Sequence, residues 1–164
     1  MLISPLQGVD PRPRITQQFG LNPAMYDQFG LKGHDGIDFG VRVGTPIFAP
    51  FDGVARLKDD GTAGYGMHIK IRCPEKGLEC VLGHLNRSLI QDGQSVKLGD
   101  KIAMSGNSGF STGAHLHFGI RRLVKSLGDV WDWKVADFDN GFKGYYDQLH
   151  HTLTWEGSLF VIEI

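Results

Sequence analysis

The stretch Gly113-Ala114-His115-Leu116-His117-Phe118-Gly119-Ile120 alternates polar and apolar side chains, which is the pattern of a half-buried β-strand. Successive side chains of a strand point to opposite faces, so His115 and His117 share one face while Leu116 and Phe118 share the other. Two imidazoles about 7 Å apart on one polar face can share a metal ion or a water molecule.

A second stretch, Gly33-His34-Asp35-Gly36-Ile37-Asp38-Phe39-Gly40, alternates in a similar way. An extended backbone would place His34, Gly36 and Asp38 on one face, where Gly36 would leave space between the two other side chains. Two histidines and one carboxylate are a ligand set of catalytic zinc, and they leave a fourth coordination position open. The sequence therefore predicts a metal site assembled from two separate strands.

Together these stretches resemble the lysostaphin/LytM-type zinc metallo-endopeptidases of bacterial cell walls. That family carries an H-x3-D motif near the start of its domain and an H-x-H motif near the end, which correspond here to residues 34–38 and 115–117. Three further stretches resemble the family's hairpin, extra histidine and last loop, namely residues 44–54, 83–85 and 105–113. The similarity runs from about Ile15 to Ile120, and the shared order of the motifs makes it specific.

The resemblance implies one zinc ion per chain, bound by His34, Asp38 and His117. It also implies that His84 and His115 are catalytic residues that do not bind the metal. One division of roles makes His115 the general base and His84 an electrophilic stabiliser. The implied substrate is a peptide of peptidoglycan, cut in the cross-link between stem peptides or in a glycine-rich bridge.

Two other readings stay open at this point. Some domains of this type are non-catalytic regulators that have lost metal ligands, and a structural module of a phage tail is a third alternative. This sequence keeps all three ligands and both extra histidines, which favours the enzyme. The sequence holds no H-E-x-x-H, G-x-S-x-G or P-loop motif, so thermolysin-like, α/β-hydrolase and nucleotide-binding functions lack support.

Composition narrows the function further. A length of 164 residues suits one domain with a single core. The 17 basic and 18 acidic side chains nearly balance and form no basic stripe, so nucleic acid is not an expected partner. No apolar run is long enough for a transmembrane segment.

The pattern of short strands and turn residues predicts an all-β fold. We expect a compact antiparallel sheet or barrel-like single domain, with long loops that form a substrate groove. Residues 1–14 should be an irregular lead-in, residues 15–122 the catalytic core, and residues 123–164 a divergent tail that packs on the core. The individual expectations are a first strand at 15–20, a hairpin of 45–50 with 53–57, strands at 67–72 and 78–85, a hairpin over 94–104, a single helical turn at 86–90 and a last strand at 159–164.

Some residues have no predicted part in the chemistry. His68 alternates within a strand and matches no motif, so we interpret it as structural, and His150 and His151 are expected to be exposed. Cys73 and Cys80 flank a short turn and are equally consistent with a disulfide and with two unlinked thiols.

The N-terminal residues contain no basic region followed by a long apolar run, so the sequence predicts no signal peptide. A wall-degrading enzyme of this kind would reach its substrate by release during phage lysis, as an endolysin, or on a virion. A host protein without its leader is the alternative.

Overall fold

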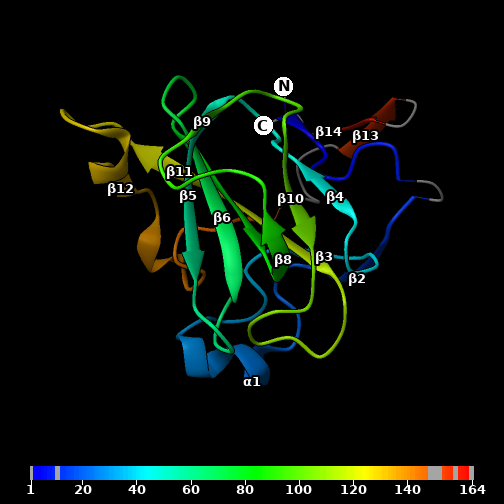
Figure 1. Ribbon diagram of the computed structural model, residues 1–164. Coiled ribbons are helices and arrows are strands. Elements are labelled where there is room, and N and C mark those ends of the chain that lie inside the picture. The colour runs from blue at the N-terminus through cyan, green and yellow to red at the C-terminus, as the bar shows by residue number, and fades with distance from the viewer. Residues whose placement is uncertain (1, 10–11, 148–152, 157–158, 163–164) are drawn as a thin grey trace.

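The computed structural model describes residues 2–9, 12–147, 153–156 and 159–162 (Figure 1). Antiparallel strands dominate it, and the one α-helix among these residues is the short α1 (Pro23–Tyr26). This confirms the predicted all-β class. Among the described residues, no helix has the length and apolar composition needed to span a membrane.

The main sheet has the strand order β2-β3-β11-β7-β6-β5-β9, and β12 pairs with β11. A second sheet has the order β4-β10-β8, and a third sheet, β1-β14-β13, joins segments from the two ends of the chain. The strands are β1 (Leu2–Ile3), β2 (Arg14–Gln17), β3 (Ile37–Gly40), β4 (Pro46–Phe48), β5 (Gly53–Asp59), β6 (Met67–Cys73), β7 (Leu78–Gly83), β8 (Leu85–Ser88), β9 (Ser95–Val96), β10 (Lys101–Ser105), β11 (Leu116–Val124), β12 (Lys134–Val135), β13 (Leu153–Glu156) and β14 (Leu159–Ile162). The described residues also contain three 3-10 helices, namely η1 (Asp27–Phe29), η2 (Val130–Asp132) and η3 (Phe138–Asn140).

The β4-β10-β8 sheet lies against the main sheet, and the core lies between these two sheets (Figure 1). Ile69 and Leu82 from the main sheet belong to the same buried cluster as Ile47 and Ala103 from the second sheet. Each large aliphatic side chain buried here stabilises the fold by about 1.5–3 kcal/mol. Because the cluster includes Phe118 of β11, it also fixes the strand that carries His117.

The positions of the strands were easier to predict from the sequence than the pairing between them. The expected strands at 67–72 and 78–85 are confirmed as β6 and β7, which pair with each other. The predicted hairpin of 45–50 with 53–57 is wrong, because β4 pairs with β10 while β5 pairs with β6 and β9. The predicted hairpin over 94–104 is wrong for the same reason, since β9 and β10 belong to different sheets.

The helix prediction also needs correction. Residues 85–88 form strand β8, which pairs with β10, instead of the expected helical turn at 86–90. The α-helix lies instead at Pro23–Tyr26, where Pro23 at the start of α1 supplies a backbone angle that suits a helical N-terminus. The expected last strand is confirmed for residues 159–162, and His150 and His151 lie outside the described residues.

Cys73 and Cys80 are free, buried thiols. Cys80 lies opposite Ile71 and Cys73 lies opposite Leu78, so the two cysteines do not face each other across the β6–β7 ladder. Burial raises the pKa of the Cys80 thiol well above its usual range. Of the two alternatives, the unlinked thiols are therefore the correct one.

The segment that follows β11 covers the face of β7 that points away from the core. A cluster of one acid and two arginines is buried between them. Glu79, which is fully buried, accepts hydrogen bonds from Arg72 Nε at 2.6 Å and from Arg121 Nε at 2.7 Å. Arg72 also donates to the backbone oxygens of Val130 and Trp133, which ties η2 to the sheet. Residues 130–133 thus contact the main sheet, while the packing of a tail of residues 123–164 on the core and the boundaries at 14 and 122 remain predictions.

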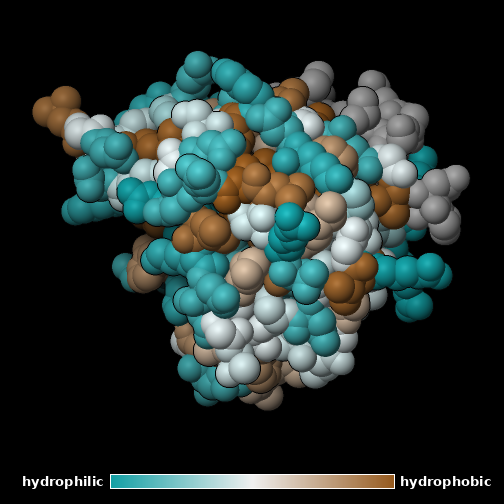
Figure 2. Space-filling view, in the orientation of Figure 1, coloured by the Kyte–Doolittle hydropathy of each residue, from teal (hydrophilic) through white to brown (hydrophobic). Residues whose placement is uncertain are grey.

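Hydrophilic and hydrophobic residues are mixed on the face shown in Figure 2. At the lower end, where α1 and the loop between β10 and β11 lie in Figure 1, the colours are mostly pale. Residues of intermediate hydropathy, such as glycine, serine and tyrosine, therefore dominate this end of the sheet.

Candidate metal centre

His117 and Asp38 come together because two neighbouring strands place them in one register position. His117 lies on β11 directly opposite Asp38 on β3. His34 does not lie on a strand, since β3 begins at Ile37, so strand alternation does not explain its position. Its backbone is instead held by two hydrogen bonds, from Gly20 N to His34 O and from His34 N to Leu21 O.

Three donor atoms converge at the centre of the site. His34 Nε2 lies 2.9 Å from His117 Nδ1 and 3.0 Å from Asp38 Oδ1, and His117 Nδ1 lies 3.1 Å from the same oxygen. Ligands that lie 2.0–2.1 Å from one tetrahedral zinc ion are about 3.3 Å apart. The spacing of these three atoms therefore suits a single shared metal ion.

The groups on the far sides of the two rings indicate which ring nitrogens carry protons. His34 Nδ1 lies 3.1 Å from the carbonyl oxygen of Gln18, to which it donates. His117 Nε2 is buried, and the nearest acid to it is Asp35, whose Oδ1 lies 3.5 Å away. An N–H at each of these positions leaves His34 Nε2 and His117 Nδ1 as lone pairs.

Two lone pairs and a carboxylate oxygen thus face one another with no proton between them. Such a set of acceptors repels itself unless a cation lies at its centre, so the residues present fit a metal ion. Burial alone would raise the pKa of Asp38, but the neighbouring His117 and His34 rings outweigh burial and hold this pKa well below its usual range. Asp38 is therefore ionised at neutral pH.

His84 and His115 lie beside this centre with their rings 4.4 Å apart. His84 Nδ1 lies 2.7 Å from the carbonyl oxygen of Ser108, and His115 Nδ1 lies 2.8 Å from that of Gly113. Each Nδ1 therefore donates to a carbonyl group, which leaves each Nε2 as an acceptor. His115 Nε2 lies 3.5 Å from Asp38 Oδ2, so it points toward the metal centre.

The backbone of His84 is in the left-handed region, with φ at 59°. This conformation is uncommon for a residue with a β-carbon and is often found at functional sites. The hydrogen bond from His84 N to Tyr65 O, 2.8 Å long, holds it in place. Burial lowers the pKa of His84 to about 4, with contributions from neighbouring His117 and His115, so the ring stays neutral at neutral pH.

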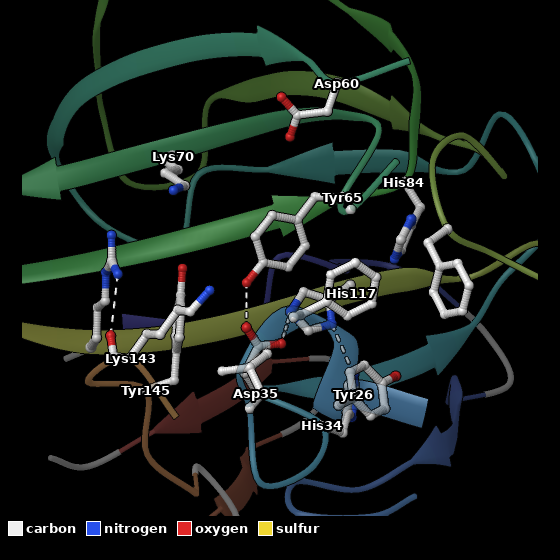
Figure 3. A pocket seen from close by; sticks show the side chains of 15 residues that line it. Tyr26, His34, Asp35, Asp60, Tyr65, Lys70, His84, His117, Lys143 and Tyr145 are labelled. Atoms are coloured by element: carbon white, nitrogen blue, oxygen red, sulfur yellow. Dashed lines mark hydrogen bonds and ion pairs between the residues drawn. The ribbon is translucent and has the colours of Figure 1, made fainter. Parts of the chain in front are cut away.

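The structure therefore brings all five predicted residues together, although their roles as ligands and catalysts remain predictions. It also shows two residues that the sequence reasoning missed, Asp35 and Tyr65. The Tyr65 hydroxyl donates a short hydrogen bond to Asp35 Oδ2, while Asp35 Oδ1 faces His117 (Figure 3). Only the position of Asp35 next to His34 could have drawn attention to it.

Asp35 is a second acid within reach of the two histidines, since donor atoms of His34, Asp35 and His117 all lie within 4.8 Å of one another. We assign Asp38 as the ligand because its Oδ1 lies within 3.1 Å of both inward-facing nitrogens. Asp35 instead faces the outer nitrogen of His117. A carboxylate in that position orients a ligating histidine and raises its basicity.

Replacing Asp35 by asparagine is expected to weaken zinc binding about 10- to 100-fold, the usual effect of losing a carboxylate behind a ligating histidine. Tyr65→Phe should weaken binding in the same direction but less, because the carboxylate remains. Competition with a fluorescent chelator measures both affinities, and Asp139→Asn, at an exposed position, is the control. Wild-type affinity in Asp35→Asn would contradict this role.

Gly36 is required because the two strands approach closely at this point. A β-carbon here would lie 2.5 Å from the backbone oxygen of Phe118 and 2.7 Å from Cε1 of His117. The open space that the sequence suggested above Gly36 is thus occupied by the His117 ring.

Gly36→Ala should therefore displace His117, lower the free energy of unfolding by about 1–3 kcal/mol and reduce zinc affinity. Gly113→Ala is the matched control, since a β-carbon there meets nothing within 4 Å. Urea unfolding and chelator competition on both variants test the expectation, which fails if the two variants behave alike.

Two hollows open on either side of the histidines. One cavity of about 270 Å³ lies toward Tyr65 and Tyr145, and another of about 290 Å³ lies toward Thr16 and Ser111. Phe29 of η1 and Phe110 of the loop between β10 and β11 stack edge to face, with ring centroids 5.3 Å apart. This contact links η1 to the loop between β10 and β11 beside the site. The arrangement fits the groove between loops that the sequence predicted.

A β-fold with three converging ligands and two flanking histidines defines a metallopeptidase type of centre. The chain belongs to peptidase family M23, whose model matches residues 32–129, more than half of its length. This confirms the lysostaphin/LytM-type resemblance. The M23 family is zinc-dependent, in agreement with the candidate site.

Two relatives illustrate the similarity. A metalloprotease of Haemophilus influenzae is 42% identical over 105 residues, which cover 64% of this chain and 22% of the relative. The peptidoglycan DD-endopeptidase ShyA of Vibrio cholerae is 35% identical over 110 residues, which cover 67% of this chain and 25% of ShyA. The chain thus spans about a quarter of the length of these curated relatives.

Solved structures agree with these relatives. The catalytic domain of lysostaphin from Staphylococcus simulans is 25% identical, with a TM-score of 0.60, and the match covers 84% of this chain and 90% of that domain. The catalytic domain of the prophage-encoded M23 protein EnpA from Enterococcus faecalis is 28% identical, with a TM-score of 0.58 and coverage of 72% and 87%.

Proposed function

We propose that this chain is a zinc-dependent endopeptidase that hydrolyses peptide bonds of bacterial peptidoglycan. The observation that carries the proposal is the convergence of three unprotonated ligand atoms beside two histidines with free acceptor nitrogens. Membership of family M23 and the similarity to a peptidoglycan DD-endopeptidase support the choice of substrate.

His34, Asp38 and His117 would hold the zinc ion. When bound there, zinc supplies Lewis acidity, which polarises the scissile carbonyl group and lowers the pKa of a water molecule. The chain's own residues then handle the protons. His115 Nε2 faces the centre as an acceptor. We therefore assign His115 as the group that accepts the proton of the attacking water and later delivers this proton to the leaving amine.

His84 has a different role from the electrophilic stabiliser suggested at the start. Its Nδ1 donates to Ser108 O, and a pKa of about 4 keeps the ring neutral, so its Nε2 has no proton to give to an oxyanion. We assign His84 as a second acceptor that lies beside His115 and helps to orient the attacking water.

The site of action we propose is the cell wall, reached by phage lysis or on a virion as the sequence suggested. The likeness to the prophage-encoded EnpA supports a phage origin.

The test is to incubate the protein with purified peptidoglycan of known cross-bridge, after removal of metal and again after addition of one equivalent of zinc. Zinc should restore a fall in turbidity, and mass spectrometry of the released muropeptides should show which peptide bond was cut. Binding to the wall with zinc present but without new muropeptides would show that the protein is a non-catalytic wall module and not an enzyme. No binding and no cleavage would exclude both.

A further inference from the structure

The cavity of about 270 Å³ is lined both by His34 and His117 of the candidate metal centre and by a group of basic side chains. Its far end is lined by Lys70 of β6, Arg121 of β11 and Lys143 of the C-terminal segment. In Figure 3, Lys70 and Lys143 lie on the side of Tyr65 that is opposite to His84. A substrate bound at the metal centre can therefore extend toward these cations.

The buried acid behind this end of the cavity is already neutralised. Glu79 is shared between two arginines, with Arg72 Nε at 2.6 Å from one oxygen and Arg121 Nη2 at 2.6 Å from the other. One carboxylate thus faces two guanidinium groups, which leaves a net positive charge before either lysine is counted.

Neither Lys70 nor Lys143 forms an ion pair with a residue in the described part of the chain. The two acids that line the cavity have partners of their own, because Asp35 accepts from Tyr65 and Asp60 lies 3.7 Å from His68. Burial lowers the pKa of Lys70; the negative charge of Glu79 opposes this effect, and the positive charges of Arg121, Lys58 and Arg72 add to it. An anion in the cavity would relieve that repulsion.

Tyr145 supplies a hydrogen-bond donor at the same place. Its side chain is 2% exposed, and its hydroxyl lies toward Tyr65 without making a hydrogen bond of ordinary geometry. An incoming acceptor would give this buried hydroxyl a hydrogen bond of good geometry.

The backbone around Lys143 holds its side chain toward the cavity. Lys143 has φ at 51°, a left-handed conformation that costs energy for a residue with a β-carbon. Asn140 stabilises the turn, since its Oδ1 accepts from Phe142 N and Gly144 N while its Nδ2 donates to Tyr145 O. Arg121 adds a hydrogen bond to Lys143 O.

We propose that the far end of this cavity, formed by Lys70, Lys143 and Tyr145, binds a carboxylate of the peptide substrate. Two ammonium groups and one hydroxyl are suitable donors for a carboxylate. The preferred substrate is therefore an acidic stem peptide, because a glycine-rich bridge offers no side-chain carboxylate. This inference rests on the proposed endopeptidase function and names the class of substrate for it.

The experiment compares two cross-linked stem-peptide substrates that differ only in whether their carboxylates are free or amidated. The zinc-loaded protein should cleave the free form with a kcat/KM higher by about 10- to 100-fold, the value of a charge-assisted hydrogen bond in a partly buried site. Lys143→Gln should remove most of this preference by slowing cleavage of the free form alone. Lys143→Arg, which keeps the charge, should restore part of it.

Lys76→Gln is the matched control, because Lys76 is exposed in the turn between β6 and β7 and lines no part of the cavity. Thermal unfolding of each variant shows whether the fold is intact, and Lys70→Gln is a second test should Lys143→Gln fail to fold. Equal cleavage of free and amidated substrates by the wild type would overturn the proposal. Equal losses on both substrates in Lys143→Gln would also overturn it.

A binding measurement separates this inference from the proposed function. If neither substrate is cleaved, calorimetry with the uncross-linked stem peptide, free or amidated, still tests the cavity. Tighter binding of the free form that Lys143→Gln abolishes would support the carboxylate site in a protein that is not an endopeptidase. Equal binding of the two forms would overturn the carboxylate site.

Discussion

His117→Ala should lose bound zinc and activity together, whereas His115→Ala should keep zinc and lose only activity. His117 Nδ1 lies within 3.1 Å of both other ligand atoms, so its removal deletes one of three protein ligands. His115 approaches the centre only through Asp38 Oδ2, at 3.5 Å. Its removal takes away a positioned general base, and the rate should fall on the order of 10²-fold or more.

The measurement is zinc content by elemental analysis and hydrolysis rate on the same purified samples. Wild type and His115→Ala should each contain close to one equivalent of zinc, and His117→Ala should contain much less. His68→Ala is the control histidine, because its ring is buried beside Gly66 and Asp60, away from the ligands. Equal zinc loss in His115→Ala and His117→Ala would show that His115 is a ligand.

The site residues could be named from sequence because each lies in a short motif. The register of the strands explains why these residues meet. On β11, His117 lies opposite Asp38 of β3 and also opposite Gly83, the last residue of β7, which directly precedes His84. The structure places His34 beside the other site residues for a reason different from the predicted strand alternation. Its position depends on backbone hydrogen bonds to the segment before α1, which no alternation pattern can show.

Asp35 and Tyr65 could not be predicted because their meeting depends on three separate segments. Asp35 precedes β3, Tyr65 precedes β6, and His117, which Asp35 faces, lies on β11. The prediction of strand pairing failed for the same reason. The alternation of a segment shows that it is a strand, but its partner is set by long-range packing, as for β4 with β10 instead of the adjacent β5.

Strand β7 is buried on both of its faces, which the composition of the sequence did not predict. A strand on the surface of a sheet buries alternate residues, yet every residue from Leu78 to Gly83 is buried. The reason is that the C-terminal segment covers the second face, with Val130 and Tyr145 both buried. That cover is what encloses Glu79 and turns the adjoining space into a cavity with basic walls.

Glu79→Gln should lower the free energy of unfolding by about 3–5 kcal/mol, the cost of removing one partner from a buried ion pair. The change keeps the side-chain volume but leaves Arg72 and Arg121 buried with no carboxylate between them. It should also loosen the C-terminal segment, because Arg72 holds Val130 O and Arg121 holds Lys143 O through the same cluster. Urea unfolding gives the first quantity, and amide hydrogen exchange in residues 130–146 gives the second. Glu75→Gln, an exposed carboxylate in the turn between β6 and β7, should change the stability by no more than about 0.5 kcal/mol. A Glu79→Gln variant as stable as Glu75→Gln would show that the two arginines need no buried counter-ion and that the C-terminal segment is held by apolar contacts alone.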